Sequence, residues 1–197
     1  VVLTDREENV EFINRALRDA GHTVRCHWID SVERVPDALI EYAAELLWLF
    51  SNGNLAEIRQ VSQARRTAAP MVPLLVVSED VSENAISKAM AAGAQDLVSV
   101  SHVERLRSVA ERELRSFQLE RALNETLKSA AEYREQLTNL KAGTEDAIAC
   151  AQEGVLVEAN LAWAQLFGHN NTEEIQGQPI MDLFEHSSQT TLKGGLI

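Results

Sequence analysis

The sequence has 197 residues, of which 45% are hydrophobic and 24% charged, and its formal net charge is −12 at pH 7. This composition excludes a disordered chain and suits one large or two small domains with packed cores. The acidic balance argues against nucleic acid or an anionic membrane as the main partner, because both reward clustered Lys and Arg. We find no membrane span and no signal peptide in the sequence, so we expect a cytoplasmic protein.

The two cysteines, Cys26 and Cys150, are far apart in the sequence and lack the spacing of a metal site. We interpret them as small apolar residues in a reducing compartment, and we expect neither a metal nor a cofactor. Val1 is not an initiator residue, and Gly194-Gly195 are typical of a chain about to start another strand. We therefore expect the chain to be a piece of a longer protein.

Alternating strands and helices are expected over the first hundred residues, because short apolar runs alternate with segments of helical periodicity. The expected strands are 1–4, 22–29, 45–50, 74–77 and 96–100, and the expected helices are 10–20, 31–43, 55–67 and 81–92. This order predicts an α/β fold with a five-stranded parallel, doubly wound sheet and right-handed crossovers.

The third expected strand, 45–50, is a continuous apolar run followed by the polar residues 51–54. Such a run is typical of a strand buried on both faces. In an open α/β sheet, the loops at the carboxyl ends of the strands carry the chemistry. The residue at this strand end is Phe50, so whether a working site exists there is the main question about function.

The first hundred residues resemble the receiver domain of two-component response regulators. The resemblance rests on the acids after the first strand, the run Glu-Leu-Leu-Trp-Leu-Phe, the Val-Pro entry to the fourth strand and Gly93-Ala94-Gln95-Asp96. It implies a flavodoxin-like sheet. In that family, two acids hold Mg²⁺, an aspartate accepts phosphoryl, and a Ser or Thr and a lysine complete the site; metal and ammonium stabilise the phosphoryl oxygens.

Most of these functional residues are replaced in this sequence. The resemblance places Asp5 at the first acid and Ser78 at the hydroxyl, and both are retained. The replaced positions are the second acid, the acceptor, the aromatic switch and the lysine, which are here Arg6, Phe50, Leu97 and Val100. The resemblance therefore implies a degenerate phosphorylation site in a pseudo-receiver, and we expect the Phe50 ring to fill the former pocket with apolar packing.

The two retained residues also have interpretations without any phosphoryl chemistry. Asp5 stands at a helix start, where an acid contributes roughly 0.3–1 kcal/mol through the helix dipole, and Ser78 is a strand-end cap. We favour these interpretations. The alternatives are a phosphorylation-competent receiver that uses Asp5 or Ser78 as an unorthodox acceptor, and a small-ligand pocket that also includes Ser51 and Asn52.

Residues 102–142 contain neither proline nor glycine and predict a helix of roughly 60 Å, longer than a domain-capping helix needs. Heptads give a good apolar seam after Leu119 and a poor one before it. We expect the first part to pack on the sheet and the second to form a parallel coiled coil in a homodimer; a solvated single helix is the alternative. The residues predicted for the dimer helix are Leu119, Leu123, Leu127, Ala130, Tyr133, Leu137 and Leu140.

The last fifty residues predict two short strands joined at Glu153-Gly154, a short helix from Leu161, another from Asn171 and a helix over 180–184. Ala159-Asn160, Leu166-Phe167-Gly168 and 172–177, in this order, are similar to the first half of a PAS domain, which is α+β. Because half a sheet exposes edges and core, we expect this part to be poorly ordered or completed by a partner chain.

The predicted domains are therefore a pseudo-receiver at 1–101, a helix at 102–143 and a partial PAS domain at 144–197. Together they resemble the amino-terminal part of FimX-type bacterial signalling proteins. That resemblance implies a non-enzymatic module for dimerisation, localisation and relay, in a parent with GGDEF and EAL domains. It also implies protein partners of the signalling or type IV pilus machinery, with cyclic di-GMP bound only through domains absent here.

Overall fold

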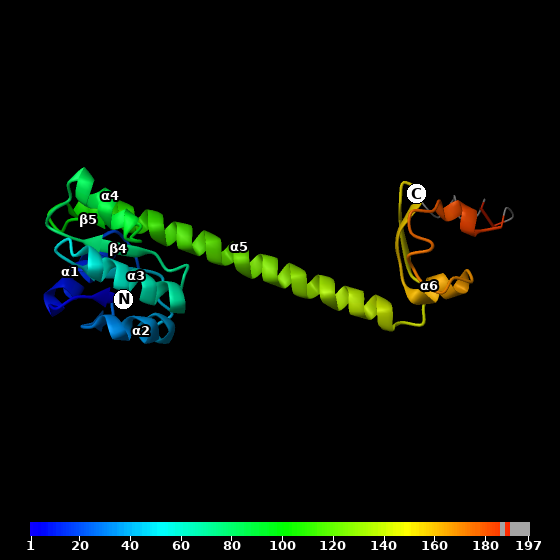
Figure 1. Ribbon diagram of the computed structural model, residues 1–197, viewed down its shortest axis with the longest axis horizontal. Coiled ribbons are helices and arrows are strands. Elements are labelled where there is room, and N and C mark those ends of the chain that lie inside the picture. The colour runs from blue at the N-terminus through cyan, green and yellow to red at the C-terminus, as the bar shows by residue number, and fades with distance from the viewer. Residues whose placement is uncertain (186–187, 190–197) are drawn as a thin grey trace. The chain divides into compact units, whose positions relative to one another are not determined.

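The computed structural model describes residues 1–185 and 188–189, and the chain forms two compact units, Val1–Glu125 and Thr126–Ile197. Figure 1 labels several of their elements, and the same numbering is used for all elements below. The division falls inside the long helix α5 (Val103–Gly143), whereas the domain boundaries predicted from the sequence follow its two ends.

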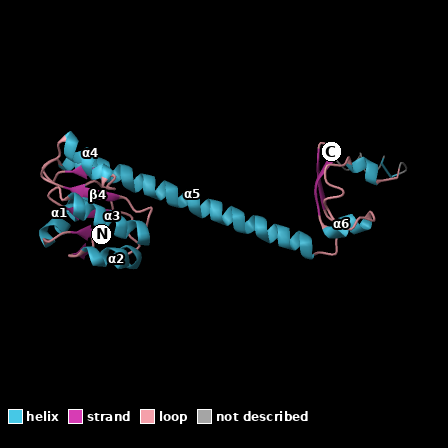
Figure 2. Ribbon diagram, in the orientation of Figure 1, coloured by secondary structure: helices cyan, strands magenta, loops and turns pink. Residues whose placement is uncertain are grey.

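The first unit is built on a five-stranded parallel sheet with the strand order β2-β1-β3-β4-β5, and Figure 2 colours its strands magenta. The strands are β1 (Val2–Leu3), β2 (Trp28–Ile29), β3 (Leu47–Phe50), β4 (Leu74–Val77) and β5 (Asp96–Val98). The central strands are apolar on both faces because helices cover both. The predicted fold class is confirmed.

Two apolar clusters lie on opposite faces of this sheet. One joins alternate strand residues to α2 (Val35–Glu41), α3 (Leu55–Ala68) and α4 (Glu83–Ala91). The other joins the remaining strand residues to α1 (Glu7–Asp19) and the first part of α5. The 3₁₀ turn η1 (Val32–Arg34) precedes α2. The first third of α5 therefore belongs to the core of this unit.

In the first unit, four predicted strands and two predicted helices are longer than the observed ones, and three of them have a clear physical reason. The strand predicted over 22–29 is reduced to Trp28–Ile29, because its neighbour β1 offers only Val2 and Leu3 for pairing. The helix predicted over 31–43 ends earlier, since Ala43 has φ 45° and leaves the helical conformation. The strand predicted over 96–100 ends at Val98, where its pairing with β4 stops.

The described part of the second unit contains the hairpin of β6 (Ala149–Gln152) and β7 (Val155–Ala159). Glu153 and Gly154 both have positive φ, 52° and 79°, as a type I′ turn requires. The helix α6 (Leu161–Leu166) and the 3₁₀ turn η2 (Ile180–Leu183) follow. Leu156, Ala164, Ile175 and Ile180 are buried together. The hairpin and the segments that follow it therefore have a small apolar core of their own.

The helices predicted from Asn171 and over 180–184 are corrected by the structure. Residues 172–177 form turns, in which the amides of Ile175 and Gln176 both donate to the carbonyl of Thr172. Gly177 then reverses the chain with φ 80°. The second segment is the single 3₁₀ turn Ile180–Leu183. Neither segment therefore forms an α-helix.

Candidate functional site

A polar hollow of about 600 Å³ lies where the carboxyl ends of the five strands meet. It brings together five of the six residues of the predicted degenerate site, which are Asp5, Arg6, Phe50, Ser78 and Val100. The strand order explains why these residues lie close together. β3 lies between β1 and β4, and the loops after all three strands are at the carboxyl edge of the sheet.

Phe50 forms an apolar wall of this hollow. Its half-buried ring packs against the apolar cluster beneath α1 and α5, as an aromatic ring requires for its large apolar surface. The predicted apolar packing is therefore present. The prediction that the ring fills the former pocket is wrong, since the hollow remains open beside it.

The start of α1 supplies the charged side of the hollow. Thr4 is buried, and its Oγ1 accepts hydrogen bonds from the Arg6 amide at 3.2 Å and from Asn9 Nδ2 at 2.8 Å. Asp5 and Arg6 are both exposed at this helix start. On the opposite side, Ser51 Oγ donates to Glu57 Oε2 at 2.7 Å.

Ser78 and Leu97 lie deeper in the sheet. Ser78 is 6% exposed, and its amide donates to the Val98 carbonyl at 2.9 Å, so its backbone extends the sheet ladder. Leu97 does not reach the main hollow; it is 1% exposed in the core and lines a smaller hollow of about 260 Å³. Asn52 and Ser78 line both hollows.

An ion-pair cluster anchors α5 to β5. The mostly buried carboxylate of Asp96 binds Arg105 Nη2 at 3.2 Å and Arg112 Nη2 at 3.1 Å. Hydrogen bonds to Glu113 and then to Asp96 raise the pKa of the Arg112 guanidinium. The sequence analysis missed this cluster; its signal was two arginines seven residues apart on one helix face, following an acid at a strand start.

Beyond Phe117, which is 8% exposed, the apolar side chains of α5 turn outward. The exposed fractions along the predicted dimer helix are 65% for Leu119, 59% for Leu123, Leu127 and Leu137, 67% for Tyr133 and 69% for Leu140, and Ala130 is exposed as well. These seven residues, called the α5 stripe below, belong to none of the three apolar clusters of the described residues.

Asn160 ties the end of α5 to the hairpin of the second unit. Its Nδ2 donates to the carbonyls of Lys141 at 3.0 Å and Asp146 at 2.7 Å, and its Oδ1 accepts from the amides of Ile148 at 2.9 Å and Trp163 at 3.0 Å. Both donor hydrogens and both acceptor positions of this amide are therefore in use. The sequence analysis used Asn160 only as part of the PAS resemblance.

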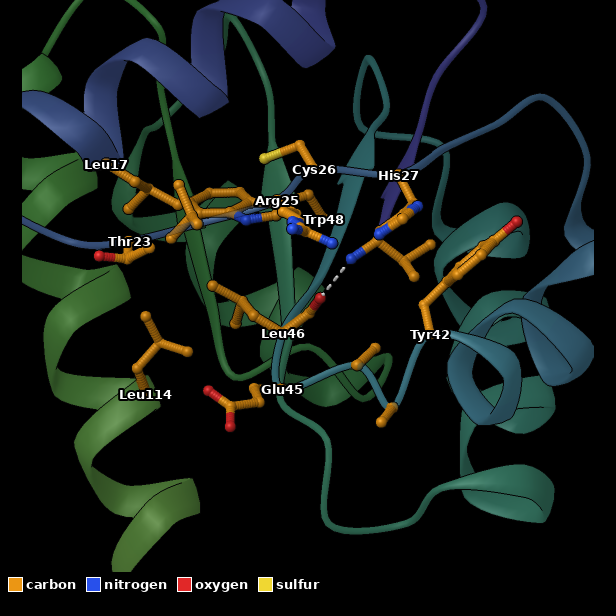
Figure 3. A pocket seen from close by; sticks show the side chains of 14 residues that line it. Leu17, Thr23, Arg25, Cys26, His27, Tyr42, Glu45, Leu46, Trp48 and Leu114 are labelled. Carbon is orange, nitrogen blue, oxygen red and sulfur yellow. Dashed lines mark hydrogen bonds between the residues drawn. The ribbon is translucent and has the colours of Figure 1, made fainter.

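A second hollow, of about 330 Å³, opens at the amino ends of β1, β2 and β3. Figure 3 shows His27 stacked on Tyr42, and their ring centroids are 3.9 Å apart. The Val1 nitrogen donates to the Leu46 carbonyl at 2.9 Å. Burial raises the pKa of the Cys26 thiol, which keeps it protonated at neutral pH. This favours a structural role for Cys26 over a reactive one.

The described residues contain neither a metal-binding cluster nor a membrane helix. No group of three or more His, Cys, Asp or Glu side chains among them is placed to hold a metal ion. No helix in this part of the chain has the length and apolar character needed to cross a membrane.

Solved structures with a similar fold include NtrX from Brucella abortus in complex with ADP, with a TM-score of 0.52 and 19% identity. The match covers 78% of this chain and 31% of NtrX. The ATP complex of NtrX gives a TM-score of 0.50 at 23% identity and covers 74% of this chain and 35% of NtrX. The strand order 2-1-3-4-5 is that of CheY. The first unit has a CheY-like receiver fold.

A CheY-like protein, tadZ from Pseudomonas aeruginosa PAO1, has a TM-score of 0.46 at 22% identity, covering 57% of this chain and 95% of its own. No curated protein sequence matches the chain. A family model described as a PAS domain matches residues 142–194. The carboxyl-terminal segment is therefore PAS-like, and the receiver precedes it in the same chain.

The receiver hollow does not fit the Mg²⁺ that this fold binds in its phosphorylated members. Magnesium requires several oxygen ligands in octahedral geometry. At the two positions expected for the acid pair, Asp5 offers a carboxylate but Arg6 offers a guanidinium, and Phe50 has no ligand atom. We therefore derive no phosphoryl-transfer step through a metal at these residues.

Proposed function

We propose that this chain is a non-enzymatic regulatory module in which a receiver that takes no phosphoryl group is joined by a dimerising helix to a PAS domain. Phe50 carries the proposal, because it stands at the end of β3 in the hollow where phosphorylated receivers have their acceptor. An aromatic ring has no nucleophilic atom. Arg6 and Val100 line the same hollow without replacing the lost metal ligand and ammonium.

Phosphorylation tests this part of the proposal. The chain is incubated with acetyl phosphate and Mg²⁺, and its intact mass is measured. We expect no added phosphoryl group on the wild type or on Phe50→Asp, because that variant still lacks the acid pair for the metal and the lysine ammonium. The triple variant Arg6→Asp/Phe50→Asp/Val100→Lys serves as the positive control. A phosphoryl group on Asp5 or Ser78 of the wild type would instead support an unorthodox receiver.

The α5 stripe supports dimerisation with a second copy of the chain. Monomeric proteins rarely leave a large contiguous apolar patch in water, and each fully buried leucine contributes roughly 1.5–3 kcal/mol. The stripe repeats at heptad spacing, which a second identical helix matches along its whole length. It begins just after Phe117, the last residue of α5 that is buried in the receiver.

Light scattering tests the dimer at micromolar concentration. We expect twice the chain mass of 21.8 kDa for the wild type and 21.8 kDa for Leu123→Glu/Leu137→Glu, because two charges enter the apolar seam. Ile40→Glu is the matched control, since Ile40 is 66% exposed on α2 and lies outside the stripe. A wild-type monomer would contradict the dimer.

We further propose that the parent protein is of the FimX type. In this proposal, the module localises and relays signals in the cytoplasm to GGDEF and EAL domains that handle cyclic di-GMP and control type IV pili. The order of receiver, long helix and PAS-like segment supports it. Sequencing the gene beyond Ile197 tests it: intact GGDEF and EAL motifs are expected, and a different output domain would contradict the assignment.

A further inference from the structure

We propose that the two copies of α5 pair in parallel and in register, with Arg115 of each copy bound to Glu120 of the other. The inference rests on the proposed dimer and adds its register and the charged contact that would fix its parallel orientation. With Leu123, Ala130 and Leu137 at heptad position a, Arg115 is at g and Glu120 is at e of the next heptad. In a parallel coiled coil, these two positions on opposite helices face each other and set orientation.

Both side chains are free to form this pair. Arg115 and Glu120 are exposed, and no ion pair joins either of them to another described residue. The neighbouring charges are already engaged: Arg112 Nε lies 2.8 Å from Glu113 Oε1, and Arg121 Nε lies 2.9 Å from Glu125 Oε1. Within the described residues, the single chain thus leaves unpaired the two charges that a parallel partner would bring together.

The surface next to Arg115 also lies on the face of α5 where the seam begins. A shallow, open depression of about 380 Å³ lies between side chains of α5 and is lined by Ser108, Glu111, Arg112, Arg115, Ser116 and Leu119. Ser116 and Leu119 are the a and d residues at which the seam begins. The helix of a second copy that packs on Leu119 would therefore lie beside Arg115, at the point where α5 leaves the receiver core.

An antiparallel pair uses these charges less well. In an antiparallel coiled coil, the e positions of one helix face the e positions of the other. If the two stripes overlap fully, Glu120 then lies opposite Lys141 of the second copy, and Arg115 has no partner. Lys141 is already engaged, since its Nζ lies 2.7 Å from Glu158 Oε2 within its own chain. Charge complementarity therefore favours the parallel arrangement.

Charge reversal in the full chain tests the orientation, with the dimer dissociation constant measured by sedimentation. Arg115→Glu replaces two attractive contacts per dimer with two repulsive ones, and Glu120→Arg does the same. We expect each variant to raise the dissociation constant about tenfold at low salt. The double variant Arg115→Glu/Glu120→Arg should return to within about twofold of the wild type.

Mixing the two single variants gives an independent measurement. In a parallel heterodimer, the two substituted side chains face each other, as do the unchanged Arg115 of one copy and the unchanged Glu120 of the other. Both contacts then join a glutamate to an arginine, so the mixture should dimerise about as tightly as the wild type. Glu135→Arg is the matched control, because Glu135 is exposed at position f, away from the seam. In about 1 M salt, the differences should shrink, because charges are then screened within about 3 Å.

The outcomes separate this inference from the proposed dimer. A dimer that weakens with Glu120→Arg but not with Arg115→Glu, and that the double variant does not restore, would show antiparallel pairing. A dimer that none of the reversals changes would overturn the contact between Arg115 and Glu120 while leaving the dimer intact. A wild-type chain that stays monomeric would overturn both proposals.

Discussion

The two parts of α5 have similar composition but opposite surroundings. Between Val103 and Phe117, apolar side chains face the receiver, and Leu106 and Ala110 have no exposed surface. From Leu119 to Leu140, apolar side chains of the same kind are more than half exposed. The receiver therefore buries the apolar side chains of only the first part of the helix. For the second part, which is also apolar along one face, we propose a second copy of the helix as the partner.

The largest effect should come from Leu106, which is fully buried against the sheet. Leu106→Ala leaves a cavity and should lower the free energy of unfolding of the receiver by about 2–5 kcal/mol. Urea unfolding at two protein concentrations measures it. The loss should be the same at both concentrations, whereas Leu123→Ala should lower stability only at the concentration at which the dimer forms. Equal behaviour of the two variants would remove the distinction between the two parts of α5.

The next effect concerns Asp96, which holds the first part of α5 through Arg105 and Arg112. Asp96→Asn removes both ion pairs and should cost about 1–3 kcal/mol, because the carboxylate is mostly buried while both arginines remain partly exposed. Urea unfolding measures the loss. Arg121→Gln removes an exposed pair with Glu125 on the second part of the helix and should leave the midpoint unchanged; a shift as large as that of Asp96→Asn would contradict this assignment.

A similar effect is expected at the far end of the helix, where Asn160 holds the Lys141 carbonyl. Asn160→Asp keeps the shape but places a carboxylate against the carbonyls of Lys141 and Asp146, which should destabilise the hairpin by about 1–3 kcal/mol. Amide hydrogen exchange of β6 and β7 should rise while that of the receiver strands stays constant. Unchanged exchange in the hairpin would show that the hydrogen bonds of Asn160 do not hold the hairpin to the end of α5.

The smallest effect is in thiol labelling, which monitors the two units separately. Cys26 is part of the receiver, partly buried and with its pKa raised by burial, while Cys150 is exposed on β6. We expect a maleimide to modify Cys150 first at neutral pH. Leu106→Ala should accelerate labelling of Cys26 and leave Cys150 unchanged. Faster labelling of Cys26 in the wild type would contradict the described packing.

The sequence predicted most of the fold because the strands of the receiver are short apolar runs with clear turn signals. It also placed Phe50, Ser78 and Asp5 at strand ends, where the structure gathers them. The lengths of the paired strands were harder to predict. The alternating pattern of 22–29 does not reveal that only two residues of β1 pair with β2. The extent of the helix predicted from Asn171 was also hard to predict, because Gly177, with φ 80°, reverses the chain after a few residues.

The contacts that the sequence did not reveal depend on three-dimensional approach. Asp96 contacts Arg112 only because α5 passes the start of β5, and the four hydrogen bonds of Asn160 involve residues up to nineteen positions away. Sequence periodicity describes one helix or strand at a time and cannot predict tertiary contacts between different elements. It did predict the exposed stripe, because a heptad seam is a property of a single helix.

Hydrogen exchange along α5 is the decisive test of the difference between its two parts. The exchange of individual helix amides is measured in the full chain at a concentration well below and at one well above the dimer dissociation constant. Residues 103–117 should be protected equally at both concentrations, and residues 119–140 should gain protection only at the higher one. Protection of 119–140 that does not change with concentration would show that this part of α5 needs no second copy, and would contradict the proposed dimer helix.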